Sequence, residues 1–87
     1  MKTLHFSGLV YIEDNKILLA FSKNKNAWYL PGGKIDPFEN SKEALIREIK
    51  EELDVFLNLT KIQFYCHTQA LAYGEANLMM EQDCFIY

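Results

Sequence analysis

The sequence is poor in cysteine and has no long hydrophobic segment. Its two cysteines, Cys66 and Cys84, are too few for a disulfide-stabilised scaffold and lack the CxxC spacing of a metal site. Both lie in apolar, strand-like surroundings, so we expect two buried free thiols. No segment has the composition of a signal peptide or the length needed to span a membrane. These absences favour a cytoplasmic protein without a membrane partner.

Positive charge is also scarce. The 87 residues include 9 Lys and Arg against 12 Asp and Glu, which gives a formal net charge of −3. Modules that bind nucleic acids need basic patches to neutralise phosphates, so this balance argues against a nucleic-acid partner. An acidic excess suits a site for cations, although it commonly serves only solubility. The length allows a single domain, residues 1–87, with a small hydrophobic core.

The apolar runs predict β-strands separated by turn residues. Residues 4–12 and 16–21 are β-branched and aromatic, and the short polar connection between them predicts an antiparallel hairpin. A short strand at residues 28–30 is expected to stop at the Pro-Gly-Gly turn that follows it. Two further strands are predicted at residues 61–70 and 81–87, with a loop at residues 73–77 between them.

One segment has the features of an amphipathic helix. Asn40 is a favourable N-cap residue, and Glu43 stands three positions later, which is the spacing of a capping box. The helix is expected to end near Asp54, before a β-branched and an aromatic residue. The apolar side chains that recur at the helical period and predict its buried face are Leu45, Ile46, Ile49 and Leu53.

Three glutamates stand close together on this predicted helix. Glu48, Glu51 and Glu52 occupy positions i, i+3 and i+4, so their carboxylates share one flank. Carboxylates at this spacing repel one another unless a cation neutralises them, and grouped hard oxygen ligands suit Mg²⁺ or Mn²⁺. The upstream Pro-Gly-Gly turn can bring backbone groups close to a metal or a phosphate. Taken alone, an acidic helix edge is more commonly a solvated surface.

The joint spacing of these residues resembles the signature of the Nudix hydrolases. That signature reads Gly, five residues, Glu, seven residues, Arg-Glu, an aliphatic residue, any residue, Glu-Glu, any residue, Gly and an aliphatic residue. The matching residues are Gly33, Glu39, Arg47, Glu48, Ile49, Glu51, Glu52 and Val55. The sole departure is Asp54, which stands where the signature has glycine. Aspartate tolerates the left-handed conformation that commonly ends a helix, so this departure leaves the glutamates untouched.

The resemblance implies a fold and a set of roles. The fold would be the α/β class, a Nudix-type α/β/α sandwich with a mixed sheet. Glu48, Glu51 and Glu52 would bind Mg²⁺ or Mn²⁺ together with the Gly32 carbonyl, and Glu48 or Glu52 would activate the attacking water. Gly33 would belong to the turn beside the metal. Glu39 and Arg47 would pair and hold the loop against the helix.

The resemblance also suggests an incomplete domain, because family members are usually longer and carry a second long helix. We therefore expect a chain truncated on its C-terminal side, with an apolar edge at residues 85–87 that favours a homodimer. Many members recruit another acidic residue from a later loop. The downstream candidates for that role are Glu75, Glu81 and Asp83. For each of them an ordinary surface role is the simpler interpretation.

The implied activity is Mg²⁺-dependent hydrolysis of a nucleoside diphosphate linkage in a small-molecule nucleotide. We favour a nucleoside polyphosphate pyrophosphohydrolase that acts on standard or oxidised nucleoside triphosphates. The alternatives are an ADP-ribose or nucleotide-sugar pyrophosphatase, a non-catalytic nucleotide sensor or interaction module, and a structural domain whose acidic helix binds nothing. Residues that could line a base pocket, each with ordinary packing as its default role, are Tyr11, Phe21, Tyr73 and Met80.

Overall fold

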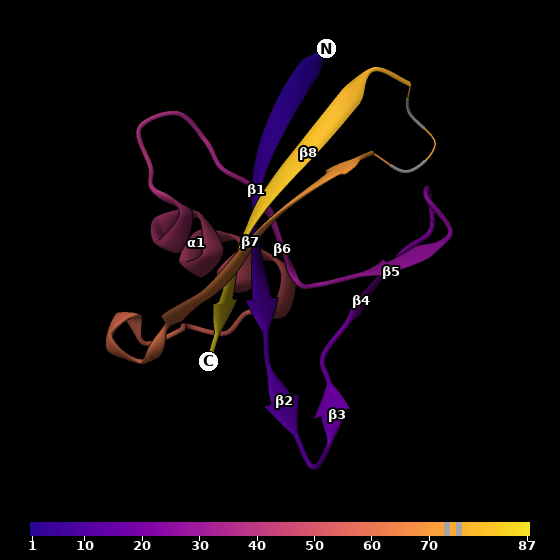
Figure 1. Cartoon of the computed structure of the whole chain (residues 1–87). Coiled ribbons are helices and arrows are strands. Elements are labelled where there is room, and N and C mark those ends of the chain that lie inside the picture. The colour runs from indigo at the N-terminus through magenta and orange to yellow at the C-terminus, as the bar shows by residue number, and fades with distance from the viewer. Residues whose placement is uncertain (73, 75) are drawn as a thin grey trace.

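A four-stranded mixed sheet forms the centre of the molecule (Figure 1). The structure is a computed structural model that describes residues 1–72, 74 and 76–87. The sheet has the order β6-β1-β8-β7, and its strands are β1 (Lys2–Val10), β6 (Gly32–Lys34), β7 (Gln63–Leu71) and β8 (Leu78–Ile86). β1 runs parallel to β8 and antiparallel to β6, while β7 and β8 are antiparallel. This mixed sheet confirms the expected α/β class.

Strand β8 occupies an inner position in the sheet, between β1 and β7. It begins three residues before the predicted start at residue 81, because its N-terminal part continues the parallel pairing with β1 as far as Leu78. Phe85 is only 3% exposed. The predicted apolar edge at residues 85–87 was therefore wrong, and the edge strands among the described residues are β6 and β7. The homodimer stays a prediction, which light scattering over a concentration series would test.

The predicted hairpin of residues 4–12 with residues 16–21 forms only at its tip. There, β2 (Ile12–Glu13) pairs with β3 (Lys16–Ile17) across Asp14 and Asn15, both in the left-handed region. The longer prediction was wrong because β1 uses its two edges for β6 and β8. A second hairpin joins β4 (Ala20–Ser22) to β5 (Ala27–Tyr29), the latter close to the strand expected at residues 28–30.

The segment predicted as a Pro-Gly-Gly turn contains a strand instead. Gly32 begins β6 and pairs with Gly8 of β1. Its φ of 143° is a conformation that glycine adopts readily and other residues rarely adopt, and a Cβ there would overlap the carbonyl oxygen of Ser7. Close backbone approach, rather than chain reversal, is therefore the reason for glycine at this position. The sequence does not distinguish these two uses of glycine.

The helix forms where the sequence predicts it. α1 (Ser41–Leu53) begins after Asn40, whose side chain accepts the Glu43 N–H at 2.8 Å while the Glu43 carboxylate accepts the Asn40 N–H at 2.9 Å. This reciprocal capping box satisfies two donors that a helix start leaves unpaired. Asp54 ends the helix in the left-handed conformation, with φ 56° and ψ 38°. The predicted tolerance of aspartate at the glycine position is thus confirmed.

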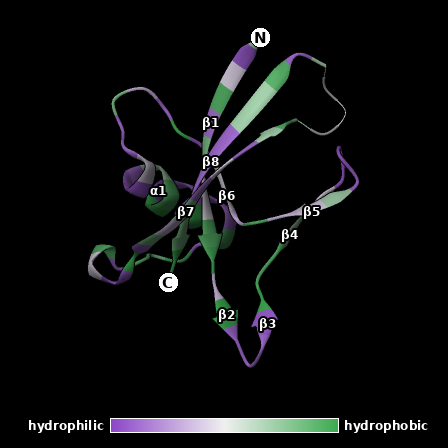
Figure 2. Ribbon diagram, in the orientation of Figure 1, coloured by the Kyte–Doolittle hydropathy of each residue, from purple (hydrophilic) through white to green (hydrophobic). Residues whose placement is uncertain are grey.

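Helix α1 covers one face of the sheet, and the β4–β5 hairpin lies on the other side (Figure 1). The hydrophobic side of α1 is turned toward the strands (Figure 2). The segment around the short 3₁₀ helix η1 (Leu59–Lys61) also contributes to the core between α1 and the sheet. The core residues are Leu9, Leu45, Ile49, Leu57, Ile62 and Phe85. In the described part of the chain, no helix is long and apolar enough to cross a membrane. The predicted loop at residues 73–77 includes Tyr73 and Glu75, which lie outside the described residues.

Candidate functional site

The three helix glutamates differ in how they are held. The Glu48 side chain is 19% exposed, against 58% for the Glu51 side chain. The Glu48 carboxylate occupies the space beside Gly33, where a Cβ on residue 33 would overlap it. Glu52 accepts a hydrogen bond from the Gly32 N–H at 3.3 Å. Two of the three carboxylates, those of Glu48 and Glu52, thus contact the Gly32–Gly33 backbone of β6, while the residues Glu51 and Glu52 remain exposed to solvent.

The pairing of β6 with β1 turns the Gly32 backbone toward these carboxylates. The Leu9 N–H donates to the Pro31 carbonyl, and the Ile35 N–H donates to the His5 carbonyl. Because hydrogen-bonded and non-hydrogen-bonded pairs alternate in antiparallel strands, the Gly8–Gly32 pair between them is non-hydrogen-bonded. The Gly32 N–H and carbonyl therefore point away from β1, along the outer edge of the sheet. This orientation is the one that the predicted metal-binding role of the Gly32 carbonyl requires.

Glu52 lies in an environment that disfavours its charge. Partial burial raises the pKa of its carboxyl group above the usual range, and the negative charges of Glu48 and Glu51 raise it further. The hydrogen bond from the Gly32 N–H opposes this shift. The three carboxylates thus repel one another, and a cation bound among them would relieve this repulsion.

Arg47 links the loop before the helix to the glutamates. Its Nε and Nη2 donate to the two oxygens of Glu39 at 3.1 and 2.7 Å, and Nη2 also donates to the Lys34 carbonyl at 3.0 Å. On the helix side, Nη1 donates to Glu48 Oε1 at 2.9 Å. The bidentate contact with Arg47 lowers the pKa of Glu39, and it raises the pKa of the guanidinium group. Arg47 therefore joins β6, the loop and α1 at one point.

Sequence reasoning missed one partner in this ion-pair network. Asp36 lies 3.3 Å from Arg47 Nη2, and its backbone N–H donates to Glu39 Oε1 at 2.7 Å. An acidic residue between a glycine strand and a helix gives no periodic signal by which to find it. The loop also contains Phe38, which is fully exposed and left-handed with φ 69°.

The donor set of the acidic site fits a divalent cation. Within the described ranges 1–72, 74 and 76–87, no three acidic, histidine or cysteine side chains converge into a ready metal-binding group. The contacts above give the reason, because Arg47 draws Glu48 and Glu51 toward itself while the Gly32 N–H holds Glu52. All the available donors are nevertheless hard oxygens, and the like charges on Glu48, Glu51 and Glu52 favour a cation among them.

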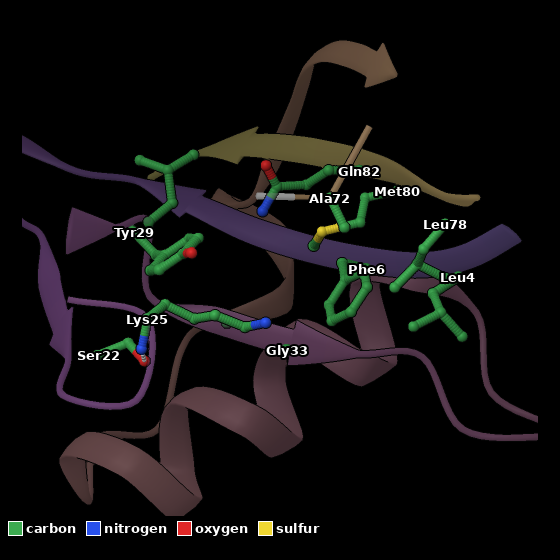
Figure 3. A pocket seen from close by; sticks show the side chains of 12 residues that line it. Leu4, Phe6, Ser22, Lys25, Tyr29, Gly33, Ala72, Leu78, Met80 and Gln82 are labelled. Atoms are coloured by element: carbon green, nitrogen blue, oxygen red, sulfur yellow. Dashed lines mark hydrogen bonds between the residues drawn. The ribbon is translucent and has the colours of Figure 1, made fainter. Parts of the chain in front are cut away.

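A largely apolar cavity of about 440 Å³ lies beside this site. It is bounded by the sheet face opposite α1 and by the β4–β5 hairpin (Figure 3). One part of its wall is Gly32 and Gly33, the same residues that meet the helix glutamates. The side chains that line it from β1, β8 and the hairpin include Leu4, Phe6, Ser22, Tyr29, Leu78, Met80 and Gln82.

The candidates for base contacts are only partly brought together. Met80 lines the cavity, but Tyr11 and Phe21 are not among its lining residues. Tyr11 packs near Tyr87, and the Phe21 ring packs edge-on against the Trp28 ring with 5.1 Å between the ring centroids. Tyr73 lies outside the described residues. The alternation of side chains along β1 and β8 is the signal that could have identified the remaining lining residues, had the strand pairing been known.

The downstream acidic candidates contact a histidine rather than the helix glutamates. Asp83 Oδ1 lies 2.6 Å from His67 Nδ1, and Glu81 Oε1 lies 3.0 Å from His67 Nε2. These hydrogen bonds raise the pKa of His67, and they engage both acidic side chains. Glu75, the third candidate, lies outside the described residues. Glu81 and Asp83 are therefore placed as parts of a polar cluster on the sheet.

Comparison with known proteins gives one family. The family model for the NUDIX domain matches residues 1–79 of the chain. A putative 8-oxo-dGTP diphosphatase of Bacillus subtilis is 48% identical over 44 residues, which cover 51% of this chain and 30% of that protein. The CTP pyrophosphohydrolase of Escherichia coli is 37% identical over 59 residues, covering 63% of this chain and 44% of the relative. The chain thus spans less than half the length of these curated relatives.

A solved structure shares the fold. The crystal structure of the MutT NUDIX hydrolase from Burkholderia pseudomallei superposes with a TM-score of 0.83 at 25% identity. The match covers 99% of this chain and 67% of that one. The fold of the chain is therefore that of a known structure of this kind.

Proposed function

The chain belongs to the Nudix family, and we propose that it hydrolyses a nucleoside diphosphate linkage with the help of a divalent cation. The observation that carries this proposal is the shared wall of Gly32 and Gly33. On one side of it lie the carboxylates of Glu48 and Glu52, and on the other lies the apolar cavity. A nucleotide has a matching division, with charged phosphates at one end and a flat base at the other.

The acidic residues would hold the cation. Nudix hydrolases generally need a divalent metal, and here the ligands would be Glu48, Glu51, Glu52 and the Gly32 carbonyl. Bound there, Mg²⁺ or Mn²⁺ would neutralise phosphate charge and lower the pKa of water. Arg47 and Glu39 would keep the loop seated against α1, so that the glutamates and the Gly32 carbonyl face the same space.

The reaction would be attack of water on one phosphorus atom of the diphosphate. Glu48 or Glu52 would accept a proton from the water as its oxygen bonds to phosphorus. The bond from that phosphorus to the bridging oxygen would break, and the bridging oxygen would leave with the second phosphate. Products would be a nucleotide and the phosphorylated leaving group.

We favour standard or oxidised nucleoside triphosphates as substrates. Two of the relatives are named for an oxidised purine nucleotide and for CTP, which is the basis of this preference. Another relative, 51% identical over 43 residues, is named an ADP-ribose pyrophosphatase, so ADP-ribose hydrolysis is the alternative. The names point to different bases, so the base must be assigned from this chain itself. The lining of the cavity provides the groups with which to do so.

The direct test is release of nucleoside monophosphate from a nucleotide panel, with Mg²⁺ and with EDTA. The Glu51→Gln/Glu52→Gln variant should lose at least about a hundredfold in rate, because two anionic ligands become neutral. Lys42→Gln, on the same helix but with no contact to the glutamates in the described structure, is the control and should keep the wild-type rate. If folded wild-type protein binds nucleotide without releasing product, a non-catalytic nucleotide sensor replaces this proposal. If Mg²⁺ neither binds nor stabilises it, the acidic helix is structural.

A further inference from the structure

One polar side chain lies on the otherwise apolar sheet wall of the cavity. Along β1 and β8 the residues that line this wall are Leu4, Phe6, Leu78, Met80 and Gln82. Gln82 comes from the middle of β8, beside Phe6 of the parallel strand β1. In Figure 3 its amide group is directed into the space between the wall and Tyr29. A glutamine here needs an explanation, because an aliphatic residue would complete the apolar wall.

A gap in the neighbouring strand accommodates this amide. A Cβ on Gly8 would lie 2.6 Å from Gln82 Nε2 and 3.0 Å from Gln82 Cδ, so a larger residue there would displace the amide from its present position. The same Cβ would lie 3.3 Å from Leu30 Cδ1, so Leu30 borders the same space. A glycine in the interior of a central strand weakens that strand, and it commonly marks a close approach by another group. Gly8 and Gln82 together therefore form a defined seat for an amide.

The contacts of the Gln82 amide involve its oxygen and not its nitrogen. The Cys84 thiol lies 3.8 Å from Gln82 Oε1, and burial raises the pKa of this thiol to about 11. The thiol is therefore protonated at neutral pH and can donate to Oε1. Among the residues that the structure describes, Gln82 Nε2 has no hydrogen-bond partner. Gln82 Nε2 is open to solvent, because Ser7 Oγ is the one buried side-chain polar atom without a partner among the described residues. A ligand that displaces water from this amide is therefore favoured when it supplies a hydrogen-bond partner in its place.

We propose that Gln82 determines which nucleobase the cavity accepts, by hydrogen bonding to a base edge that carries an exocyclic amino group beside a ring nitrogen. A carboxamide offers one acceptor and one donor side by side, which matches that edge in cytosine and adenine. This inference rests on the proposed function, because it assumes that a nucleotide occupies the cavity. The substrate class is then an amino-bearing base attached to a diphosphate, and a diphosphate without a base is excluded.

The test is equilibrium binding in EDTA, where no metal-dependent turnover occurs. Two pairs of nucleoside diphosphates serve as probes: adenine against unsubstituted purine, and cytosine against 2-pyrimidinone. Wild-type protein should bind the amino-bearing member of at least one pair about tenfold more tightly, the size expected for hydrogen bonds to a base edge. Gln82→Leu should reduce that preference to within about twofold, while its affinity for the base without the amino group stays unchanged or rises.

Two further variants separate base recognition from folding. Gln82→Glu keeps the size of the side chain but removes its N–H donors, so it should also change the preference. Met79→Leu alters an apolar residue of the same strand that does not line the cavity, and it should keep the preference. A preference that persists in Gln82→Leu, or no preference in the wild type, would overturn the role of Gln82. Binding with the expected preference but without hydrolysis in Mg²⁺ would overturn the proposed function and leave the role of Gln82 intact.

Discussion

The two faces of the sheet use the same strands for different purposes. On the face toward α1, Leu9 of β1 and Phe85 of β8 are buried against Leu45 and Ile49 of the helix. On the opposite face, alternate residues of the same strands line a cavity. Side chains of a strand alternate between the two faces, so neighbouring residues differ completely in surroundings. Stability is concentrated on the first face, which leaves the second free to bind a ligand.

The acidic site lies where the two faces meet. β6 is an edge strand, and its Gly32–Gly33 backbone has the carboxylates of α1 on one side and the cavity on the other. A Cβ on Gly33 would overlap the Glu48 carboxylate, and a Cβ on Gly32 would overlap the Ser7 carbonyl of β1. The pair of glycines therefore connects a stabilised helix to an open binding surface. Substitutions that change one face at a time should separate stability from binding.

The largest expected effect on stability belongs to the helix face. Leu45 is fully buried in the core between α1 and the sheet, so Leu45→Ala should lower the free energy of unfolding by about 3 kcal/mol. Urea denaturation followed by circular dichroism measures this change. Because the cavity lies on the other face, the folded fraction of the variant should bind nucleotide with nearly wild-type affinity. A loss smaller than about 1 kcal/mol would contradict the assignment of the core.

The open face should show the reverse behaviour. Met80 lines the cavity and is only partly buried, so Met80→Ala should weaken nucleotide binding about tenfold through lost apolar contact with the base. Its cost in unfolding free energy should be about 1 kcal/mol, well below that of Leu45→Ala. Calorimetric titration and urea denaturation on the same samples give both values. Equal losses of stability in the two variants would remove the distinction between the faces.

The smallest expected effect concerns the part of the helix-side face that remains exposed. There His67 contacts Asp83 and Glu81, and Glu81 also contacts His5 and Gln69. The contacts of His67 with Asp83 and Glu81 raise its pKa in the folded protein. They therefore stabilise the fold fully at pH values below the pKa of histidine in the unfolded chain, and this stabilisation is lost as the pH rises through the pKa of His67 in the folded protein. His67→Asn should therefore reduce the fall in Tm between about pH 6 and pH 8. His5→Asn, the control, should retain most of that fall.

Prediction from sequence succeeded where the determinants are local. The capping box at Asn40, the left-handed Asp54 and the single carboxylate flank of α1 all depend on residues within one or two helical turns. Their positions follow from spacing alone. The pairing of Glu39 with Arg47, implied by the resemblance to a known signature, is present as a bidentate contact. The roles of these residues in binding metal and substrate stay predictions.

Prediction failed where strand pairing is non-local. β1 pairs with β8, more than seventy positions later in the chain, and this pairing removes β1 from the expected hairpin with residues 16–21. The same pairing places Gln82 over Gly8 and creates the wall of the cavity. A one-residue change of register would exchange the two faces of a strand, so local patterns cannot identify the lining residues. The interpretation of Pro31-Gly32-Gly33 as a turn failed for the same reason.

The central claim is that phosphates meet the helix carboxylates while the base enters the cavity across the Gly32–Gly33 wall. The most direct measurement is an amide NMR spectrum of the ¹⁵N-labelled chain, with Mn²⁺ added first and a nucleoside diphosphate added afterwards. Paramagnetic broadening should be strongest at Gly32, Gly33 and Glu52, and nucleotide-induced shifts should concentrate at Met80 and Gln82. Broadening centred instead on the cluster of His67, Glu81 and Asp83 would contradict the account.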